Sequence, residues 1–143
     1  MKTLTCILCL LGLSIAAAAS EVKEEVLKIF AKSYPGAQAA VWSETTEGYK
    51  VFFTRNNISY RIMYNEDGDV RLALKYYDED NLPPLIVNKV KKAYAGYYIH
   101  SVVEESTESS LNYHIILQNE KKIINLKSDS VGMLEVESKY NKG

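Results

Sequence analysis

Apolar and polar residues alternate along much of this chain, and the alternation predicts strands. One run has apolar residues at every second position: Ile58, Tyr60, Ile62 and Tyr64. A second run does the same: Val70, Leu72, Leu74 and Tyr76. A period of two is typical of a strand with one buried face and one face in water. The segment 65–68 separates the runs, and its Gly68 can take a positive φ, so we predict a hairpin turn there.

Two segments have the spacing of three and four between apolar residues that is typical of amphipathic helices. The first spans Glu21–Tyr34, and Pro35-Gly36 ends it because proline cannot continue a helix. The second starts at Pro83 and Pro84, where a missing backbone N–H costs little, and reaches about Tyr94. Further strands are predicted at 37–44, 49–55, 98–104, 111–119, 122–128 and 133–140.

The two halves of the chain match each other. The helical positions match at an offset of 60, so that Val22, Val26, Phe30, Tyr34 and Gly36 correspond to Leu82, Ile86, Val90, Tyr94 and Gly96. The strands match at an offset of 64, with Tyr49 on Tyr113 and Gly68 on Gly132. Four residues should therefore be inserted in between, and the polar run 105–110 would hold them as a longer hairpin loop. The repeated unit is a helix followed by a four-strand meander.

Joining the two units edge to edge predicts an α+β domain of two layers. Repeat one would span 20–80 and repeat two 81–143. The strands would form one antiparallel eight-stranded sheet with both helices on one face. The other face of the sheet would then have nothing in the chain to cover it.

The beginning of the chain has the pattern of a secretory signal peptide. Lys2 precedes the apolar run 4–15, and four alanines at 16–19 follow it. A membrane anchor is the alternative, but the apolar run is shorter than the roughly 20 residues that a span needs. We therefore predict cleavage after Ala19, a single domain from 20 to 143, no membrane insertion after cleavage, and a periplasmic or secreted protein.

Cysteine content and charge narrow the possible classes. Cys6 and Cys9 would leave with the signal peptide, so the remaining chain would have no disulfide and would depend on its apolar core. The sequence has 17 basic and 18 acidic side chains, and loss of Lys2 changes the net charge from −1 to −2. Nucleic-acid binding usually needs a clear basic excess, so we expect no nucleic-acid partner.

Several motifs resemble those of the PepSY-like domain family. They are Tyr34-Pro35-Gly36-Ala37, Trp42, Gly48-Tyr49-x-Val51 and Asn65-x-x-Gly68. The resemblance covers nearly all of the chain after the signal, in both repeats. These relatives are secreted proteins of Bacteroidetes-type bacteria, described as β-lactamase-inhibitor-like. The resemblance implies tandem repeats that form one curved sheet, whose open face grips the enzyme in the inhibitors themselves.

The uncovered sheet face is the candidate binding site. By alternation we expect it to carry Lys50, Phe52, Arg61, Met63, Arg71, Lys75, Tyr77, His114 and Ile116. Trp42 would join this face or the core, because Val41 competes for the buried side. Aromatic, methionine and arginine side chains on one surface are typical of a protein-binding patch. The alternative is an ordinary solvated face with a few apolar residues.

No pattern in the sequence indicates catalysis or a bound metal. His100 and His114 would lie opposite each other in a hairpin, but a zinc site needs three or four ligands. The chain has no G-x-S-x-G elbow and no glycine-rich phosphate loop. We therefore predict no catalytic residues, no metal, no cofactor and no enzyme activity.

These observations together predict a monomeric, non-enzymatic binding module. It would recognise or inhibit another protein through its open sheet face. Two alternatives stay open: a sensor that holds a small molecule or peptide on the same face, and a structural envelope protein that associates with itself through sheet edges or faces.

Overall fold

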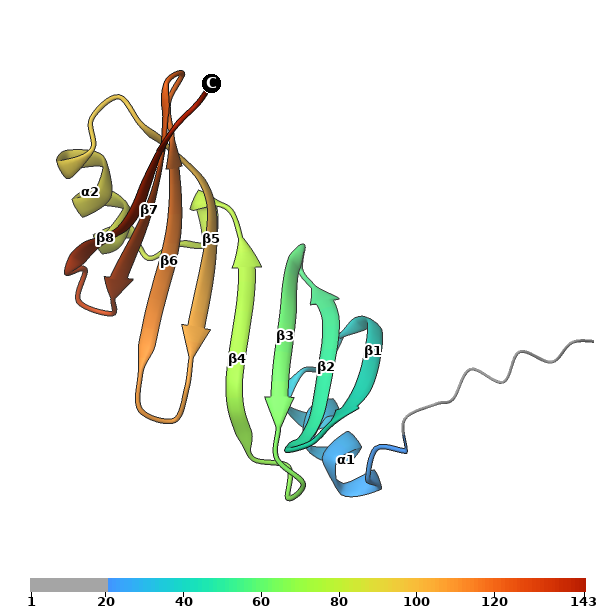
Figure 1. Ribbon diagram of the computed structural model, residues 1–143. Coiled ribbons are helices and arrows are strands. Elements are labelled where there is room, and N and C mark those ends of the chain that lie inside the picture. Colours follow the sequence, from blue (N-terminus) through green and yellow to red (C-terminus); the bar gives the residue numbers. More distant parts are fainter. Residues whose placement is uncertain (1–20) are drawn as a thin grey trace, which may run out of the picture.

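The sheet takes its strands in the order in which they occur in the chain. A computed structural model describes residues 21–143, in which eight antiparallel strands form one sheet from β1 to β8 (Figure 1). The strands of repeat one are β1 (Gln38–Thr45), β2 (Gly48–Arg55), β3 (Ile58–Tyr64) and β4 (Val70–Tyr77). Those of repeat two are β5 (Tyr98–Ser106), β6 (Leu111–Gln118), β7 (Lys122–Asp129) and β8 (Leu134–Asn141). The predicted signal peptide, residues 1–19, lies outside the described residues.

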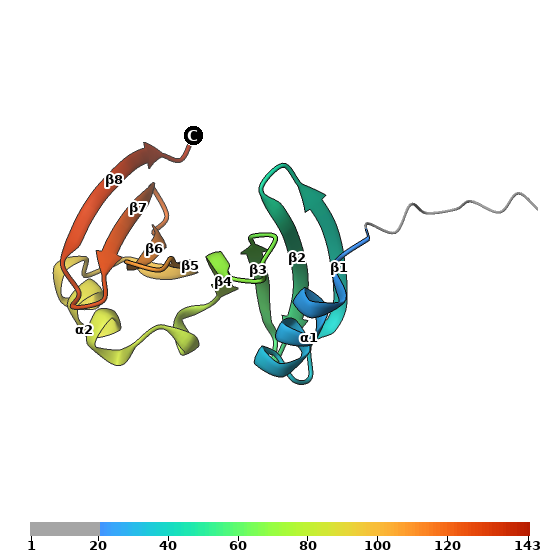
Figure 2. The ribbon, with the colours of Figure 1, turned by 90° about the horizontal axis from the view of Figure 1, so that it is seen from below.

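Both helices lie on the same side of the sheet, as Figure 2 shows, and the sheet curves away from them. Helix α1 spans Glu24–Ser33 and α2 spans Pro84–Ala93, preceded by the short 3-10 turn η1 (Glu79–Asn81). Each α-helix is shorter than its apolar spacing predicts. The prediction of an α+β fold with one eight-stranded sheet and both helices on one face is confirmed. Neither helix among residues 21–143 is long and apolar enough to cross a membrane.

Each helix has a core of its own against the sheet. Val26 and Phe30 of α1 pack on Val51, Phe53 and Ile62 of repeat one. The equivalent side of α2 covers a core of aliphatic residues and one tyrosine: Leu82, Ile86, Val90, Ile99, Val102, Tyr113, Ile115, Leu117, Ile124 and Leu126. Every residue of both cores is at most 9% exposed. The helix side of the sheet therefore supplies the apolar burial that holds the fold.

A β-bulge reverses the faces of β4 relative to the sequence prediction. Tyr64 pairs with Val70, but Met63 pairs with Leu72, so Arg71 has no partner on β3. One extra residue moves every following side chain to the opposite face. Ala73 therefore pairs with the buried Ile62 on the helix side. The predicted burial of Leu72, Leu74 and Tyr76 under the helices is wrong, and these side chains lie on the uncovered face.

The hairpins that open the two repeats differ as the offset predicts. Thr45 pairs with Gly48, which leaves a two-residue turn between β1 and β2. Ser106 pairs with Leu111, which leaves the four-residue loop 107–110 between β5 and β6. Two of the four inserted residues lengthen the loop, and the other two form the additional pair of Ser106 with Leu111. The insertion therefore lies at the predicted polar run and extends one residue beyond it. Gly48 has a φ of +136°, and a Cβ there would lie 2.2 Å from the carbonyl oxygen of Tyr64, so this tight turn requires glycine.

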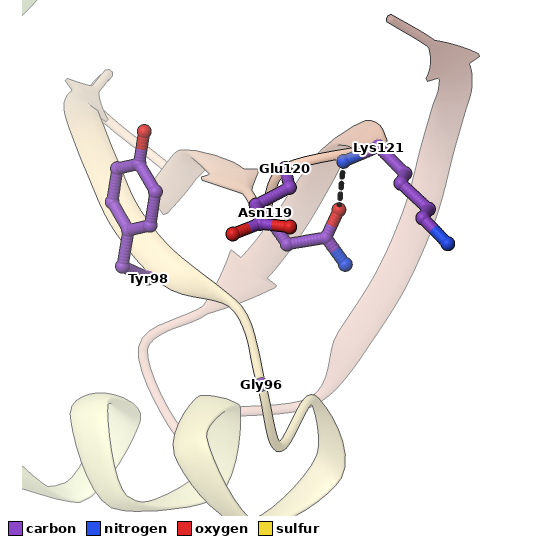
Figure 3. A pocket seen from close by; sticks show the side chains of 5 residues that line it. All are labelled: Gly96, Tyr98, Asn119, Glu120 and Lys121. Atoms are coloured by element: carbon purple, nitrogen blue, oxygen red, sulfur yellow. Dashed lines mark hydrogen bonds between the residues drawn. The ribbon is translucent and has the colours of Figure 1, made fainter.

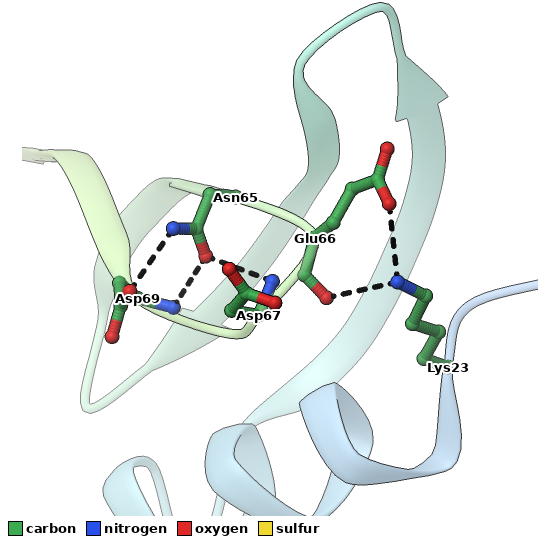
Figure 4. A network of polar contacts seen from close by, with 5 residues as sticks. All are labelled: Lys23, Asn65, Glu66, Asp67 and Asp69. Atoms are coloured by element: carbon green, nitrogen blue, oxygen red, sulfur yellow. Dashed lines mark hydrogen bonds and ion pairs between the residues drawn. The ribbon is translucent and has the colours of Figure 1, made fainter.

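A polar network fastens the start of α1 to the turn between β3 and β4 (Figure 4). The Lys23 ammonium lies 3.2 Å from a carboxylate oxygen of Glu66 and also donates to the Glu66 carbonyl. The Asn65 side-chain oxygen accepts hydrogen bonds from the backbone N–H groups of Asp67 and Asp69. This geometry is that of a plain Asx turn. In repeat two, Lys89 of α2 donates instead to the Val131 carbonyl of the turn between β7 and β8.

Candidate binding face of the sheet

Cross-strand pairing shows which side chains share the uncovered face. Phe52 on β2 lies opposite Arg61 on β3, which lies opposite Leu74 on β4. Lys50 pairs with Met63, and Met63 pairs with Leu72. A further row continues from Tyr76 through Val103 to His114. The face thus runs without interruption from repeat one into repeat two.

Apolar side chains occupy the middle of this face, where the two repeats join. We call them the central stripe: Leu72, Leu74, Tyr76, Val103 and Ile116. All five are partly exposed, and no helix of the described residues covers them. Phe52, which is 41% exposed, and Met63 extend the stripe into repeat one. A contiguous apolar surface of this kind on a protein marks an interaction site more often than scattered apolar residues do.

The charges beside the central stripe differ between the repeats. On the repeat-one side are Lys50 and Arg61, both exposed, and the guanidinium of Arg61 lies 5.8 Å from the centre of the Tyr76 ring. This cation–π contact holds the arginine against the stripe. On the repeat-two side, carboxylates gather around a histidine. The face therefore has a basic end in repeat one and a predominantly acidic end in repeat two, where Lys127 lies opposite His114.

His114 is the centre of the acidic end. Its Nδ1 lies 3.3 Å from a Glu137 carboxylate oxygen, and its Nε2 lies 3.9 Å from one of Glu105. The Nε2 atom is buried and has no hydrogen-bond partner among the described residues. Among residues 21–143 no group of three or more His, Cys, Asp or Glu side chains is arranged to hold a metal ion. His114 pairs with Val103 rather than with His100, which occupies a bulge of β5, so the expected histidine pair does not form.

Three residues of the expected site lie on the helix side. For Lys75 and Tyr77 the predicted placement on the uncovered face is wrong, and for Trp42 the structure decides between the two places that the sequence left open. Trp42 packs against the core under α1, with its ring centre 5.2 Å from that of Phe30. The competing Val41 takes the uncovered face and is 66% exposed. Lys75 and Tyr77 follow the β4 bulge, which turns them towards the helices.

The other expected residues keep their predicted place or lie beside it. Lys50, Phe52, Arg61, Met63, His114 and Ile116 share the uncovered face. Arg71 is exposed at the bulge itself. A binding role for any of these residues stays a prediction.

Sequence reasoning missed most of the central stripe, although it found the alternation that produces it. The alternation predicts Leu72, Leu74 and Tyr76 on the buried side, because they form the more apolar of the two faces of β4. The opposite face holds Ala73 and Tyr77, which are also apolar enough to be buried. Only the bulge decides between the two faces, and no residue in the turn signals it.

Lys75, Tyr77 and Glu104 form a polar junction between the two repeats, on the helix side of the sheet. The Lys75 ammonium donates to Oε1 of Glu104 over 2.6 Å, and the Tyr77 hydroxyl donates to Oε2 over 2.7 Å. The side chain of Glu104 is 15% exposed. Burial and then the bond to Glu104 raise the pKa of Tyr77 above its usual range. Burial lowers the pKa of Lys75, but the bond to Glu104 and its charge outweigh this and raise it overall.

Three cavities of the described chain lie beside the central stripe and not on it. One of about 440 Å³ is lined by Gly96, Tyr98 and the turn 119–121, as Figure 3 shows. In this turn the Asn119 side-chain oxygen accepts a hydrogen bond of 2.9 Å from the backbone N–H of Lys121. A second cavity of about 590 Å³ lies between residues 69–71 and 106–108. A third cavity of about 440 Å³ is lined by Asn112, Lys127 and Glu135, which lie on the uncovered face of repeat two, together with Asp129, Met133 and Leu134. None of these three cavities contains a residue of the central stripe.

Solved structures with the same fold come from Bacteroides species. A BLIP-like (β-lactamase-inhibitor-protein-like) protein from Bacteroides fragilis is 17% identical, with a TM-score of 0.66 over 85% of this chain and 89% of that one. A DUF2874 family protein from Bacteroides uniformis is 16% identical, with a TM-score of 0.62 over 84% of this chain and 89% of that one. A predicted periplasmic protein from Bacteroides eggerthii is 17% identical, with a TM-score of 0.62 over 84% and 88% of the two chains.

These likenesses show that the chain has the fold of BLIP-like and DUF2874 proteins. No family model matches the sequence, and no curated protein matches it. Membership of the PepSY-like family therefore stays a prediction. The periplasmic description belongs to the Bacteroides eggerthii protein, and none of the three names is that of an enzyme family.

Proposed function

We propose that this protein is a periplasmic or secreted binding module, without enzyme activity, that recognises a second protein through the uncovered face of its sheet. The observation that carries the proposal is the central stripe. Leu72, Leu74 and Tyr76 lie in the middle of the sheet, on the side without helices. Aromatic and aliphatic anchors in the middle of a polar surface are typical of the energetic centre of a protein interface.

The charges beside the stripe would orient the partner. A partner with an apolar protrusion can bury it against Leu74 and Tyr76. Acidic groups on one side of that protrusion would face Lys50 and Arg61, and basic groups on the other would face Glu105 and Glu137. Complementary charges of this kind mainly set specificity and the rate of association.

One structural neighbour at 17% identity is named BLIP-like, and this name agrees with an enzyme as the partner. In its more specific form, the proposal is that this protein inhibits the enzyme that it binds. A protein partner is favoured over a small molecule at the central stripe, because none of the three cavities described above contains a residue of the stripe.

A comparison of two triple variants tests the proposal. Phe52→Ala, Arg61→Ala and Met63→Ala together remove the repeat-one part of the face and keep the helix-side core intact. The matched control is Leu27→Ala, Leu85→Ala and Lys92→Ala, which changes exposed residues of the two helices. Each protein would be used to capture partners from the envelope fraction of the organism that encodes it, with quantification by mass spectrometry.

We expect the wild type and the control to capture at least one protein in common. The amount of this protein captured by the face variant should be at least about tenfold lower. Circular dichroism would verify that both variants fold. Equal capture by the face variant and the wild type would contradict the proposal.

A further inference from the structure

The two free edges of the sheet carry the same charged residues as the junction inside it. At that junction β4 pairs with β5, and Lys75 lies opposite Glu104. Strand β1 precedes the four-residue insertion, so it matches β5 at the offset of 60, and the counterpart of Glu104 is Glu44. Strand β8 follows the insertion, so it matches β4 at the offset of 64, and the counterpart of Lys75 is Lys139. These two strands are the ends of the strand order β1 to β8.

The pairing register confirms that these counterparts occupy equivalent places. Lys75 pairs with Tyr60, and Lys139 pairs with Ile124, the counterpart of Tyr60. Likewise Glu104 pairs with Tyr113, and Glu44 pairs with Tyr49, the counterpart of Tyr113. Lys139 and Glu44 therefore project from the helix side, as Lys75 and Glu104 do, but both are more open to solvent at the sheet edges.

We propose that β8 of one molecule pairs with β1 of a second copy in the register of the internal β4–β5 junction. Lys139 would then lie opposite Glu44 of the other copy, and the eight-stranded sheets would continue into each other. Within residues 21–143 each of these strands is paired on one side only. An edge strand of this kind presents unpaired N–H and C=O groups, which are a template for another strand.

The apolar residues of the two edges fit this register. Tyr140 is 55% exposed and Val41 is 66% exposed, and both lie on the uncovered face. In the proposed register Tyr140 lies opposite Ser43 and diagonal to Val41 of the other copy. Diagonal neighbours on antiparallel strands are close enough for an aromatic side chain to make contact. Pairing would therefore cover two of the more exposed apolar side chains.

The segments that would meet are regular. The bulge of β1 lies between Gln38 and Val41, and that of β8 is at Glu137. Residues 42–45 and 138–141 lie beyond these bulges and can form an unbroken ladder. The new junction would be weaker than the internal one. The counterpart of Tyr77 is Asn141, so the hydrogen bond that the Tyr77 hydroxyl donates to Glu104 has no equivalent there.

The proposed contact is head-to-tail, so it joins different surfaces and builds open chains rather than closed dimers. It revises the sequence-based expectation of a monomer. It uses the sheet edges and not the central stripe, so it is independent of the proposed function.

Charge reversal and mixing test this proposal. The full sequence would be expressed as wild type, as Glu44→Lys and as Lys139→Glu, and mass would be measured by sedimentation from about 10 μM to about 1 mM, a range suited to weak association. We expect the average mass of the wild type to rise with concentration. Each variant alone would place like charges opposite each other and associate about tenfold more weakly.

An equimolar mixture of the two variants is the decisive sample. In the mixture the lysine introduced at position 44 of one variant faces the glutamate introduced at position 139 of the other, and the native Lys139 and Glu44 face each other at the next contact. Association should therefore return to the wild-type level, which a contact through the sheet faces would not produce. The control is Glu25→Lys and Lys92→Glu, which make the same charge changes on exposed helix positions.

Three results would overturn the proposal. They are a wild type that stays monomeric at the highest concentration, single variants that associate as well as the wild type, and a mixture that associates no better than its components. Circular dichroism of each variant separates loss of association from loss of folding.

Discussion

The two repeats build the same architecture from different side chains. The core under α1 is aromatic: the Phe53 ring lies 4.8 Å from that of Tyr60 and 5.0 Å from those of Phe30 and Tyr34. The core under α2 is largely aliphatic. The counterparts of Phe30, Phe53 and Tyr60 are Val90, Leu117 and Ile124. The strand order and the position of the helix are nevertheless the same in both repeats.

The comparison teaches that the apolar pattern sets the fold, while the size of each side chain can vary if its neighbours change with it. Cores tolerate such combined exchanges as long as volume and pattern are kept. The aromatic core should therefore be the more sensitive to a single truncation. A large ring leaves a large cavity, and its ring–ring contacts are lost with it.

The largest expected effect is that of Phe53→Ala compared with Leu117→Ala. Both side chains are 0% exposed and occupy equivalent positions. We expect Phe53→Ala to lower the free energy of unfolding by about 4 kcal/mol and Leu117→Ala by about 3 kcal/mol. Urea unfolding followed by circular dichroism would measure both. A larger loss for the leucine variant would show that the aromatic core is not the more sensitive one.

The turns offer a second comparison. Gly48→Ala would place a Cβ against the backbone of Tyr64 and Asn65, and we expect a loss of about 3 kcal/mol. Its counterpart in repeat two is Asn112, which follows the four-residue loop and already carries a side chain. We expect Asn112→Ala to cost less than about 1 kcal/mol. Thermal unfolding of the two variants would compare them, and equal shifts of Tm would contradict the argument.

A substitution at the junction between the repeats should have the smallest effect on the free energy of unfolding, and this effect should depend on pH. Tyr77→Phe removes the hydrogen bond to Glu104, at a cost of about 1 kcal/mol near neutral pH. The raised pKa of Tyr77 means that the folded protein keeps this proton when the unfolded chain loses it. The contribution of Tyr77 to the free energy of unfolding is therefore complete below about pH 10, the usual pKa of tyrosine, and is lost as the pH rises further.

Urea unfolding between neutral pH and strongly alkaline pH would detect this difference. The wild type should lose stability above about pH 10 more steeply than Tyr77→Phe, because the variant lacks one of the groups that titrate there. Burial also raises the pKa values of Tyr64 and Tyr113, which are present in both proteins. They therefore contribute equally to the fall in the free energy of unfolding with pH in the wild type and in the variant. Identical slopes for the two proteins would rule out the role given to Tyr77.

Sequence patterns predict the elements of this fold well and their faces less well. The strand bounds at Val70–Tyr77 and Ile58–Tyr64 agree with the alternation, and the loop insertion falls at the expected polar run. These features depend on local spacing, which a single sequence displays. The faces of β4 depend on a bulge that arises from pairing with β3. Such a bulge cannot be recognised from the residues of β4 alone, because it depends on the contact between the two strands.

In the candidate site, too, the sequence predicts the face of a residue correctly where strand pairing is regular and fails where it is not. Phe52, Arg61 and Met63 lie on β2 and β3, where pairing is regular, and the alternation placed them on the correct face. Trp42 could not be placed, because both Trp42 and Val41 are large and apolar and the strand lies at the sheet edge. For Leu72, Leu74 and Tyr76, which form the most apolar part of the stripe, the alternation predicts the wrong face.

Because the strands follow chain order, nearly every ladder joins segments that are close neighbours along the polypeptide. The exception is the ladder between β4 and β5, whose strands are separated by residues 78–97. Local pairing of this kind is rapid. A chain that emerges amino end first can therefore pair its first four strands and pack their helix before α2 has emerged, and β5 can then pair with β4, which is already in place.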